Sequence, residues 1–211
     1  MRAINRLHQK SRFPRRAIHE DRQQQIAEVA RKIITTQGMD HLTMDSLAEE
    51  IGLSEAGIYR HVDSKRDILQ MVLEDVERAL LGAVNQGRMK GSTPLEQLKY
   101  ILRAHLSYSE RRKGLSFLVL DEIIHLDDRK LQIYARKIVE RYLDGISQVL
   151  ISGQSDGSVR NDLDVAMATR LYFGMVQGNV TLWALQSHSF SLTDRHEGLW
   201  DLYCRAVIPH I

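Results

Sequence analysis

Two short helical patterns joined by one glycine lie within residues 43–61, and they constrain the fold more than any other feature. The first pattern carries a small residue, Ala48, where a second helix must cross it closely, and Gly52 follows four residues later to turn the chain. Apolar residues before, in and after this turn can share one core; they are Leu47, Ile51, Leu53 and Ile58. The spacing predicts a helix-turn-helix, although a helical hairpin with no DNA-binding role would match parts of it.

The rest of the chain also predicts helices joined by short loops. Glycine (13) and proline (3) are scarce and aromatic residues make up 6% of the 211 residues, so few residues favour turns or strands. We expect loops near 87–92 and 153–157. Helical patterns with capping residues cover approximately 26–37, 44–51, 55–61, 65–84, 94–109, 115–125, 128–151, 163–185 and 192–208.

The N-terminus concentrates positive charge. Residues 1–19 hold six basic and no acidic side chains, whereas the net charge of the whole chain is only +2. A cationic arm suits a polyanionic partner such as nucleic acid or a membrane surface, and a solvated tail is an equally open interpretation. The single cysteine, Cys204, excludes an internal disulfide, and no apolar run reaches the roughly 18 to 20 residues of a spanning helix. We therefore expect a cytoplasmic protein that does not enter a membrane.

The predicted helix at 163–185 is apolar around nearly its whole circumference, so every face must be covered. Neighbouring helices of one subunit can cover one side, and a second copy is the simplest cover for the other. A central helix wrapped only by its own subunit is the alternative. Together with the last helix, the expected homodimer interface comprises Leu171, Gly174, Gly178, Leu182, Trp200 and Tyr203.

The N-terminal motif resembles the TetR family of bacterial transcriptional regulators. The matching residues span about 45 positions: the stretch 26–38, then Leu42, Thr43, Met44, Leu47, Ala48, Ile51, Gly52, Leu53, Ser54, Ile58, Tyr59, Arg60, His61, Ser64, Lys65 and Leu69. The resemblance implies an all-α homodimer with an N-terminal three-helix DNA-binding domain and a C-terminal helical domain for effector binding and dimerisation. We expect a basic arm at 1–20, the DNA-binding domain at 21–67 and the C-terminal domain at 68–211.

The resemblance also implies roles for individual residues toward duplex DNA. Backbone phosphates would contact Thr43, Tyr59, His61 and Lys65, and bases would face Glu55, Ala56, Gly57 and Arg60. The cap hydroxyls of Thr43 and Ser54, beside free amide groups, suit phosphate oxygens independently of any resemblance. Arg15 and Arg16 are placed to enter a neighbouring minor groove.

Two positions depart from the family pattern. Val62 stands where the family usually has phenylalanine, which predicts looser packing between the recognition helix and the next helix. Gly57 offers no side chain for base contact and weakens the helix by up to about 1 kcal/mol relative to alanine. Direct readout would therefore depend on Glu55, Arg60 and the arm.

The effector site is expected among the C-terminal helices. Ligand sites are apolar cavities with a few polar groups, and the scarcity of charge around Tyr172 favours an apolar or aromatic ligand. For each candidate residue, packing in the ordinary hydrophobic core is the alternative role. The candidates are His105, Tyr108, Phe117, Tyr134, Tyr142, Tyr172, Phe173, Met175, Gln177 and Trp183.

The sequence thus predicts a nucleoid-associated repressor that a small molecule releases from a palindromic operator. The alternative is an architectural DNA-binding factor controlled by a protein partner. An enzyme is not expected. The only hydrolase-like motif, G-x-S-x-G around Ser155, acts only on a turn between a strand and a helix, whereas the segment before it is predicted to be a helix. The nine histidines do not cluster as ligands, and neither a metal site nor a cofactor is expected.

Overall fold

The computed structural model describes the backbone of residues 15–209 and the side chains of residues 20–209. Most of the predicted basic arm, residues 1–14, lies outside the described residues, as do the side chains of Arg15 and Arg16. Within the described range every regular element is helical. The helices are α1 (Arg15–Thr36), α2 (Met44–Ile51), α3 (Glu55–Ile58), α4 (Lys65–Lys90), α5 (Pro94–Arg111), α6 (Leu115–His125), α7 (Arg129–Asp156), α8 (Val165–Leu185) and α9 (His196–Val207), with 3₁₀ turns at Met39–His41 and Thr193–Arg195.

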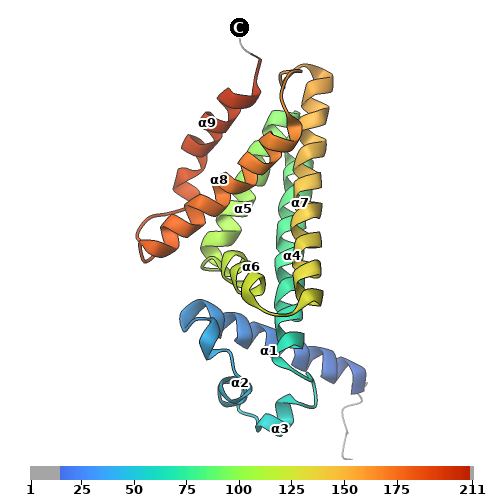
Figure 1. The fold of residues 1–211 in the computed structure, drawn as a ribbon, viewed down its shortest axis with the longest axis vertical. Coiled ribbons are helices and arrows are strands. Elements are labelled where there is room, and N and C mark those ends of the chain that lie inside the picture. The colour runs from blue at the N-terminus through green and yellow to red at the C-terminus, as the bar shows by residue number, and fades with distance from the viewer. Residues whose placement is uncertain (1–14, 210–211) are drawn as a thin grey trace, which may run out of the picture.

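The helices form a small lower unit and a larger body, which are connected by α4 (Figure 1). Helices α1, α2 and α3 lie together at one end, beneath the first turns of α4. Above them, α4 packs against both α5 and α7, and α8 and α9 complete the body. Because α4 is a continuous helix of 26 residues, its two ends cannot move independently.

The apolar spacing of the sequence accounts for the core. Leu47 and Ile58 of the helix-turn-helix are fully buried, as are Ile33 of α1 and Leu73 of α4. These side chains belong to one continuous core that reaches into the body. The all-helical fold class predicted from the sequence is confirmed for the described residues. Among them, no helix is long and apolar enough to cross a membrane.

Several helix ends differ from the predictions. Helix α1 begins at Arg15, so the last residues of the expected arm are helical, and α4 continues to Lys90 through the predicted break at Gly87. Helix α7 continues to Asp156, which places Ser155 in its last turn rather than in a loop. Ser64 precedes α4 without capping it, because its hydroxyl donates to Asp67 instead. Helix α8 begins at Val165, two residues later than expected, and the Asp164 side chain caps it by accepting from the N–H of Met167.

The glycine at position 87 marks a close approach of α4 and α5 rather than a loop. A Cβ at Gly87 would lie 2.8 Å from the carbonyl oxygen of Gln97 and 2.8 Å from the backbone nitrogen of Ile101. Gly82 lies on the same helix, and a Cβ there would meet no atom within 4 Å. A methyl group added at Gly87 would therefore collide with α5, whereas a methyl group added at Gly82 would not collide with any atom.

We expect Gly87→Ala to destabilise the protein by about 1–3 kcal/mol, because the backbone atoms of α5 must move to admit the methyl group. Gly82→Ala is the matched control, and it should leave the stability unchanged or raise it by up to about 1 kcal/mol through helix propensity. Chemical denaturation at a fixed protein concentration measures both changes. Equal effects of the two substitutions would contradict the close approach.

Candidate nucleic-acid interface

Local hydrogen bonds shape the helix-turn-helix. The Thr43 hydroxyl accepts a hydrogen bond from the backbone N–H of Ser46 (3.1 Å), and the Ser46 side chain in turn accepts from the Thr43 N–H, so α2 begins with a reciprocal cap. Helix α2 ends at Gly52, whose φ of 76° favours glycine. Two residues later the Ser54 hydroxyl accepts from the Gly57 N–H (3.2 Å) and begins α3.

Helix α3 ends at Ile58, earlier than expected, and a turn at 59–61 continues it; together they present a polar face to solvent and an apolar face to the core. Glu55, Ala56 and Arg60 are exposed, and the Tyr59 side chain retains 49% of its exposure. Ile58 and Val62 are buried in the core of the protein. The structure therefore brings the expected base-facing residues together on one surface, except that Gly57 is half-buried.

The expected phosphate contacts surround this face. Thr43 and Ser54 are exposed at the helix starts, and His61 and Lys65 are half-buried at the exit from α3. The Gln23 side chain of α1 donates to the carbonyl oxygen of His61 (3.0 Å), and Lys65 Nζ lies 3.4 Å from the carbonyl oxygen of Met39. These bonds tie both flanks of α3 to the rest of the lower unit.

An acidic pair lies on the same exposed surface. A hydrogen bond and the negative charge of Asp45, at the start of α2, raise the pKa of Glu55 above its usual value. Two carboxylates side by side repel phosphate groups, and glutamate accepts hydrogen bonds from the amino group of cytosine. The pair therefore suits a position over base edges rather than against the DNA backbone.

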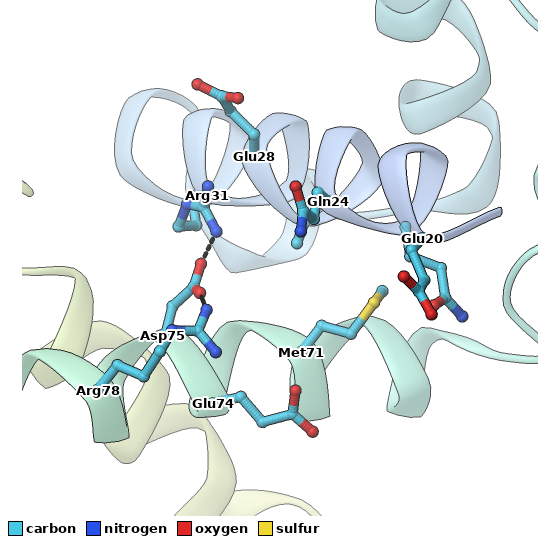
Figure 2. Close-up of a pocket in the computed structure, with 10 residues that line it drawn as sticks. Glu20, Gln24, Glu28, Arg31, Met71, Glu74, Asp75 and Arg78 are labelled. Carbon is cyan, nitrogen blue, oxygen red and sulfur yellow. Dashed lines mark ion pairs between the residues drawn. The ribbon is translucent and has the colours of Figure 1, made fainter. Parts of the chain in front are cut away.

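An ion-pair network holds the lower unit against α4. Asp75 of α4 binds both Arg31 of α1 and Arg78 one turn further along α4 (Figure 2). Arg31 and Asp75 retain only 15% and 20% of their side-chain exposure. Water therefore screens this pair less than it screens a surface pair. Beside it, a cleft of about 600 Å³ separates α1 from α4. The network couples the orientation of α1 to that of α4.

The predicted effector residues do not form one pocket. The Tyr172 hydroxyl donates to the Leu98 carbonyl (2.6 Å), and the Trp183 indole N–H donates to the Phe190 carbonyl (2.7 Å), so both act as satisfied core residues. The Tyr134 hydroxyl donates to Glu77 (2.7 Å) on the far side of α7. Gln177 and Phe173 line a groove. Tyr142 is buried next to the Phe173 ring, and His105 is buried next to Tyr142. Tyr108, Phe117 and Met175 are half-buried and do not line this groove.

Helices α8 and α9 expose an apolar face in the single subunit. Leu171 and Leu182 retain 56% and 53% of their exposure, and Gly174 and Gly178 lie between them with open space above their Cα atoms. Trp200 is half-buried. Tyr203, which was also expected at the interface, is buried inside the subunit, where its hydroxyl donates to the Ala168 carbonyl (3.1 Å). Leu202, the neighbouring residue on α9, is 69% exposed.

Ser155 and the histidines offer no catalytic or metal-binding arrangement in the described part of the chain. The Ser155 hydroxyl donates to the Ile151 carbonyl (3.0 Å) within a helix, which is not the strand-to-helix turn of a hydrolase nucleophile. Among the same residues, no group of three or more histidine, cysteine, aspartate or glutamate side chains is arranged to hold a metal ion.

Comparison with known proteins identifies relatives along most of the chain. A family model described as bacterial regulatory proteins, tetR family, matches residues 26–72, and one described as YsiA-like protein, C-terminal region, matches residues 54–206. The nucleoid occlusion factor SlmA of Vibrio atlanticus is 23% identical over 181 residues, which is 86% of this chain and 92% of the relative.

Solved structures share the whole architecture. A TetR family transcriptional regulator, PfmR from Thermus thermophilus, is 25% identical with a TM-score of 0.75, covering 85% of this chain and 97% of that chain. The transcriptional regulator FadR from Bacillus subtilis, solved in complex with stearoyl-CoA, is 21% identical with a TM-score of 0.76, covering 86% and 97% of the two chains.

Proposed function

We propose that this chain, which belongs to the TetR family of bacterial regulatory proteins, is a homodimeric repressor that a small apolar or aromatic molecule releases from its operator. Membership makes it a DNA-binding transcription regulator. The observation that supports the proposal is the exposed polar face of α3, which is held between the capped α2 and the long α4. We further propose that the protein acts in the cytoplasm, on the nucleoid.

In this proposal each subunit places α3 in a major groove. Glu55 and Arg60 face base edges, and Tyr59 and Lys65 bind phosphates on either side. A dimer then addresses two half-sites about 34 to 36 Å apart on a pseudo-palindrome. Arg15 and Arg16, which begin α1, would reach a neighbouring minor groove.

Release of DNA would proceed through α4. Helix α4 follows α3 in the chain, and Asp75, about three turns along α4, binds Arg31 of α1. A shift of α4 in the body therefore changes the separation of the two α3 helices in a dimer. To release DNA, the effector must bind more tightly to the dimer conformation in which the two α3 helices do not match the spacing of the half-sites. A tenfold difference in affinity corresponds to about 1.4 kcal/mol, and a clean switch needs several times that free energy. The structurally similar FadR was solved in complex with stearoyl-CoA, and the apolar acyl chain of that molecule supports an effector with an apolar part here.

The docking can be tested by comparing phosphate contacts with base contacts. We expect Tyr59→Ala and Lys65→Ala each to weaken binding to all DNA sequences alike, by about tenfold. Lys65→Ala should also reduce the slope of log affinity against log salt concentration by about one, because one fewer counterion is released. Glu55→Ala should instead change the preferred sequence, because it removes a base-facing acceptor. Mobility-shift titrations on selected and scrambled fragments measure both effects.

Lys90→Ala is a suitable control, because Lys90 is exposed at the end of α4 that lies farthest along the helix from Lys65. It should bind both fragments as the wild type does. If Tyr59→Ala bound DNA as tightly as the wild type, the proposed docking of α3 would be wrong.

The second candidate function is an architectural factor controlled by a protein partner. It is favoured by the SlmA relatives, which are named as nucleoid occlusion factors and match most of this chain. The two candidates predict different distributions on the chromosome, since a repressor occupies a few operators and a nucleoid factor occupies many dispersed sites. Chromatin immunoprecipitation of the native protein distinguishes them.

A further inference from the structure

Helices α6, α7 and α8 enclose an apolar groove of about 680 Å³, which we call the α6–α8 groove. Its volume lies within the range of roughly 300 to 1,000 Å³ that small-molecule sites occupy. Ile124 at its rim retains 70% of its exposure. The apolar wall is formed by Leu120, Ile123, Ile124, Val139, Leu143 and Phe173.

A buried polar pair lies further inside the subunit, and one of its members, Tyr142, contacts the wall residue Phe173. The ring of Phe173 is 6.0 Å from that of Tyr142, and the Tyr142 hydroxyl is 2.9 Å from Nδ1 of His105. Tyr142 and His105 are both buried. The second ring nitrogen of His105, Nε2, is buried with no hydrogen-bond partner. An unmade hydrogen bond in the core costs free energy that a bound polar group would recover.

The charges around this pair favour an uncharged ligand. Burial lowers the pKa of His105 to about 4, so the imidazole is neutral at pH 7. The buried polar side chains of the described residues are histidine, serine and threonine, and none is a carboxylate or an ammonium. At the groove, Arg136 and Glu140 are exposed and form an ion pair with each other, in which Arg136 Nε lies 3.5 Å from Glu140 Oε1. An ionised head group would therefore find no counter-charge beside His105.

We propose that the α6–α8 groove is the outer part of the effector site, and that its ligand is an uncharged amphiphile with an apolar chain and a terminal hydroxyl group. The chain lies along the groove, and the Phe173 side chain rotates aside so that the hydroxyl reaches His105 Nε2. A hydroxyl group both donates and accepts, so it pairs with either tautomer of the imidazole. This inference rests on the proposed function, because it names the chemistry of the effector.

The position of Phe173 connects such a ligand to the proposed dimer. Phe173 and Leu171 are two residues apart on α8, and they face the groove and the exposed apolar face respectively. Displacing the Phe173 ring therefore shifts the helix that carries the proposed interface. Cores are densely packed, so such a shift is transmitted rather than absorbed.

Calorimetric titration of the full-length protein with decan-1-ol and with decanoate tests the chemistry of the ligand. We expect decan-1-ol to bind at least about tenfold more tightly, because the buried end of the site cannot compensate a carboxylate. Equal affinity for the two probes, or no binding of decan-1-ol, would overturn the inference.

Ile124→Glu and Phe173→Ala test the location, with Ile151→Glu as the control. Ile124→Glu should weaken decan-1-ol binding by about tenfold, whereas Ile151→Glu, the same change at an exposed site of α7 outside the groove, should leave it unchanged. Phe173→Ala should strengthen decan-1-ol binding, since it opens the way to His105. If Phe173→Ala weakens binding, Phe173 is a wall of a site that ends at the surface, and the proposed contact with His105 is wrong.

DNA binding measured on the same samples separates this inference from the proposed function. Ile124→Glu should bind operator DNA as the wild type does, because α6, the helix that carries Ile124, lies above α1 and apart from α3 (Figure 1). Wild-type protein that binds DNA but not decan-1-ol overturns only the effector chemistry. Wild-type protein that binds no DNA overturns the proposed function itself.

Discussion

Replacing Leu171 and Leu182 together with glutamate is expected to convert the protein from a dimer to a monomer and to weaken its binding to palindromic DNA by about 100-fold or more. Both side chains are more than half exposed in the single subunit, so the subunit itself should still fold. In the proposed dimer the same side chains are buried against the partner. Each buried leucine contributes about 1.5 to 3 kcal/mol, and an unpaired glutamate in its place adds a desolvation cost.

The loss of DNA binding follows from geometry rather than from any change in α3. Two half-sites bound by one dimer share a single association event, whereas two monomers must each bind independently. Sedimentation velocity gives the oligomeric state, and mobility-shift titration gives the affinity. Met89→Glu is the matched control, because Met89 is 87% exposed on α4 and lies outside the α8–α9 face. If the double variant remained a dimer, the interface would have to lie elsewhere on the subunit.

Lowering the pH from about 6.5 to about 4 is expected to remove up to about 3 kcal/mol of folding stability through His105 alone. Burial lowers the pKa of this imidazole from 6.5 to about 4 in the folded protein. The unfolded chain therefore binds a proton in this pH window that the folded chain does not bind. Protonation favours the unfolded state, so stability is fully present above pH 6.5 and falls as the pH approaches 4.

The contribution of His105 can be separated from that of the carboxylates, which also titrate near pH 4. His105→Gln keeps a polar side chain of similar length next to Tyr142 and removes the titrating group. Urea denaturation of both proteins at several pH values and one protein concentration gives two stability curves. Their difference should change between pH 6.5 and pH 4. Parallel curves would mean that His105 is protonated in the folded state as easily as in the unfolded chain.

The helix-turn-helix could be predicted from the sequence because its determinants are local. Thr43 and Ser54 cap helices through residues three positions away, and Gly52 adopts a left-handed conformation that few other residues tolerate. The family resemblance, confirmed by matches to two family models, depends on this segment. The exposed face of α3 follows directly from the burial of Ile58 on its other side.

The C-terminal body was harder to predict, because its helices are similar and apolar. Tyr203 and Leu202 are neighbours on α9, and a turn of one position, about 100°, decides which of them enters the core. Apolar spacing alone did not distinguish the two. Gly87 likewise resembles a helix breaker in the sequence, and only the proximity of α5 explains why a glycine is needed within α4.

The sequence by itself determined the fold class, the family and the exposed face of the helix-turn-helix, since helix caps, turns and spacing act over three or four positions. Only the tertiary structure decided that Tyr172 and Trp183 are satisfied within the core, that His105 keeps one nitrogen unpaired, and that three helices enclose a groove in front of it. The physical reason is that cavities and buried hydrogen bonds join residues far apart in the chain, so no local pattern encodes them.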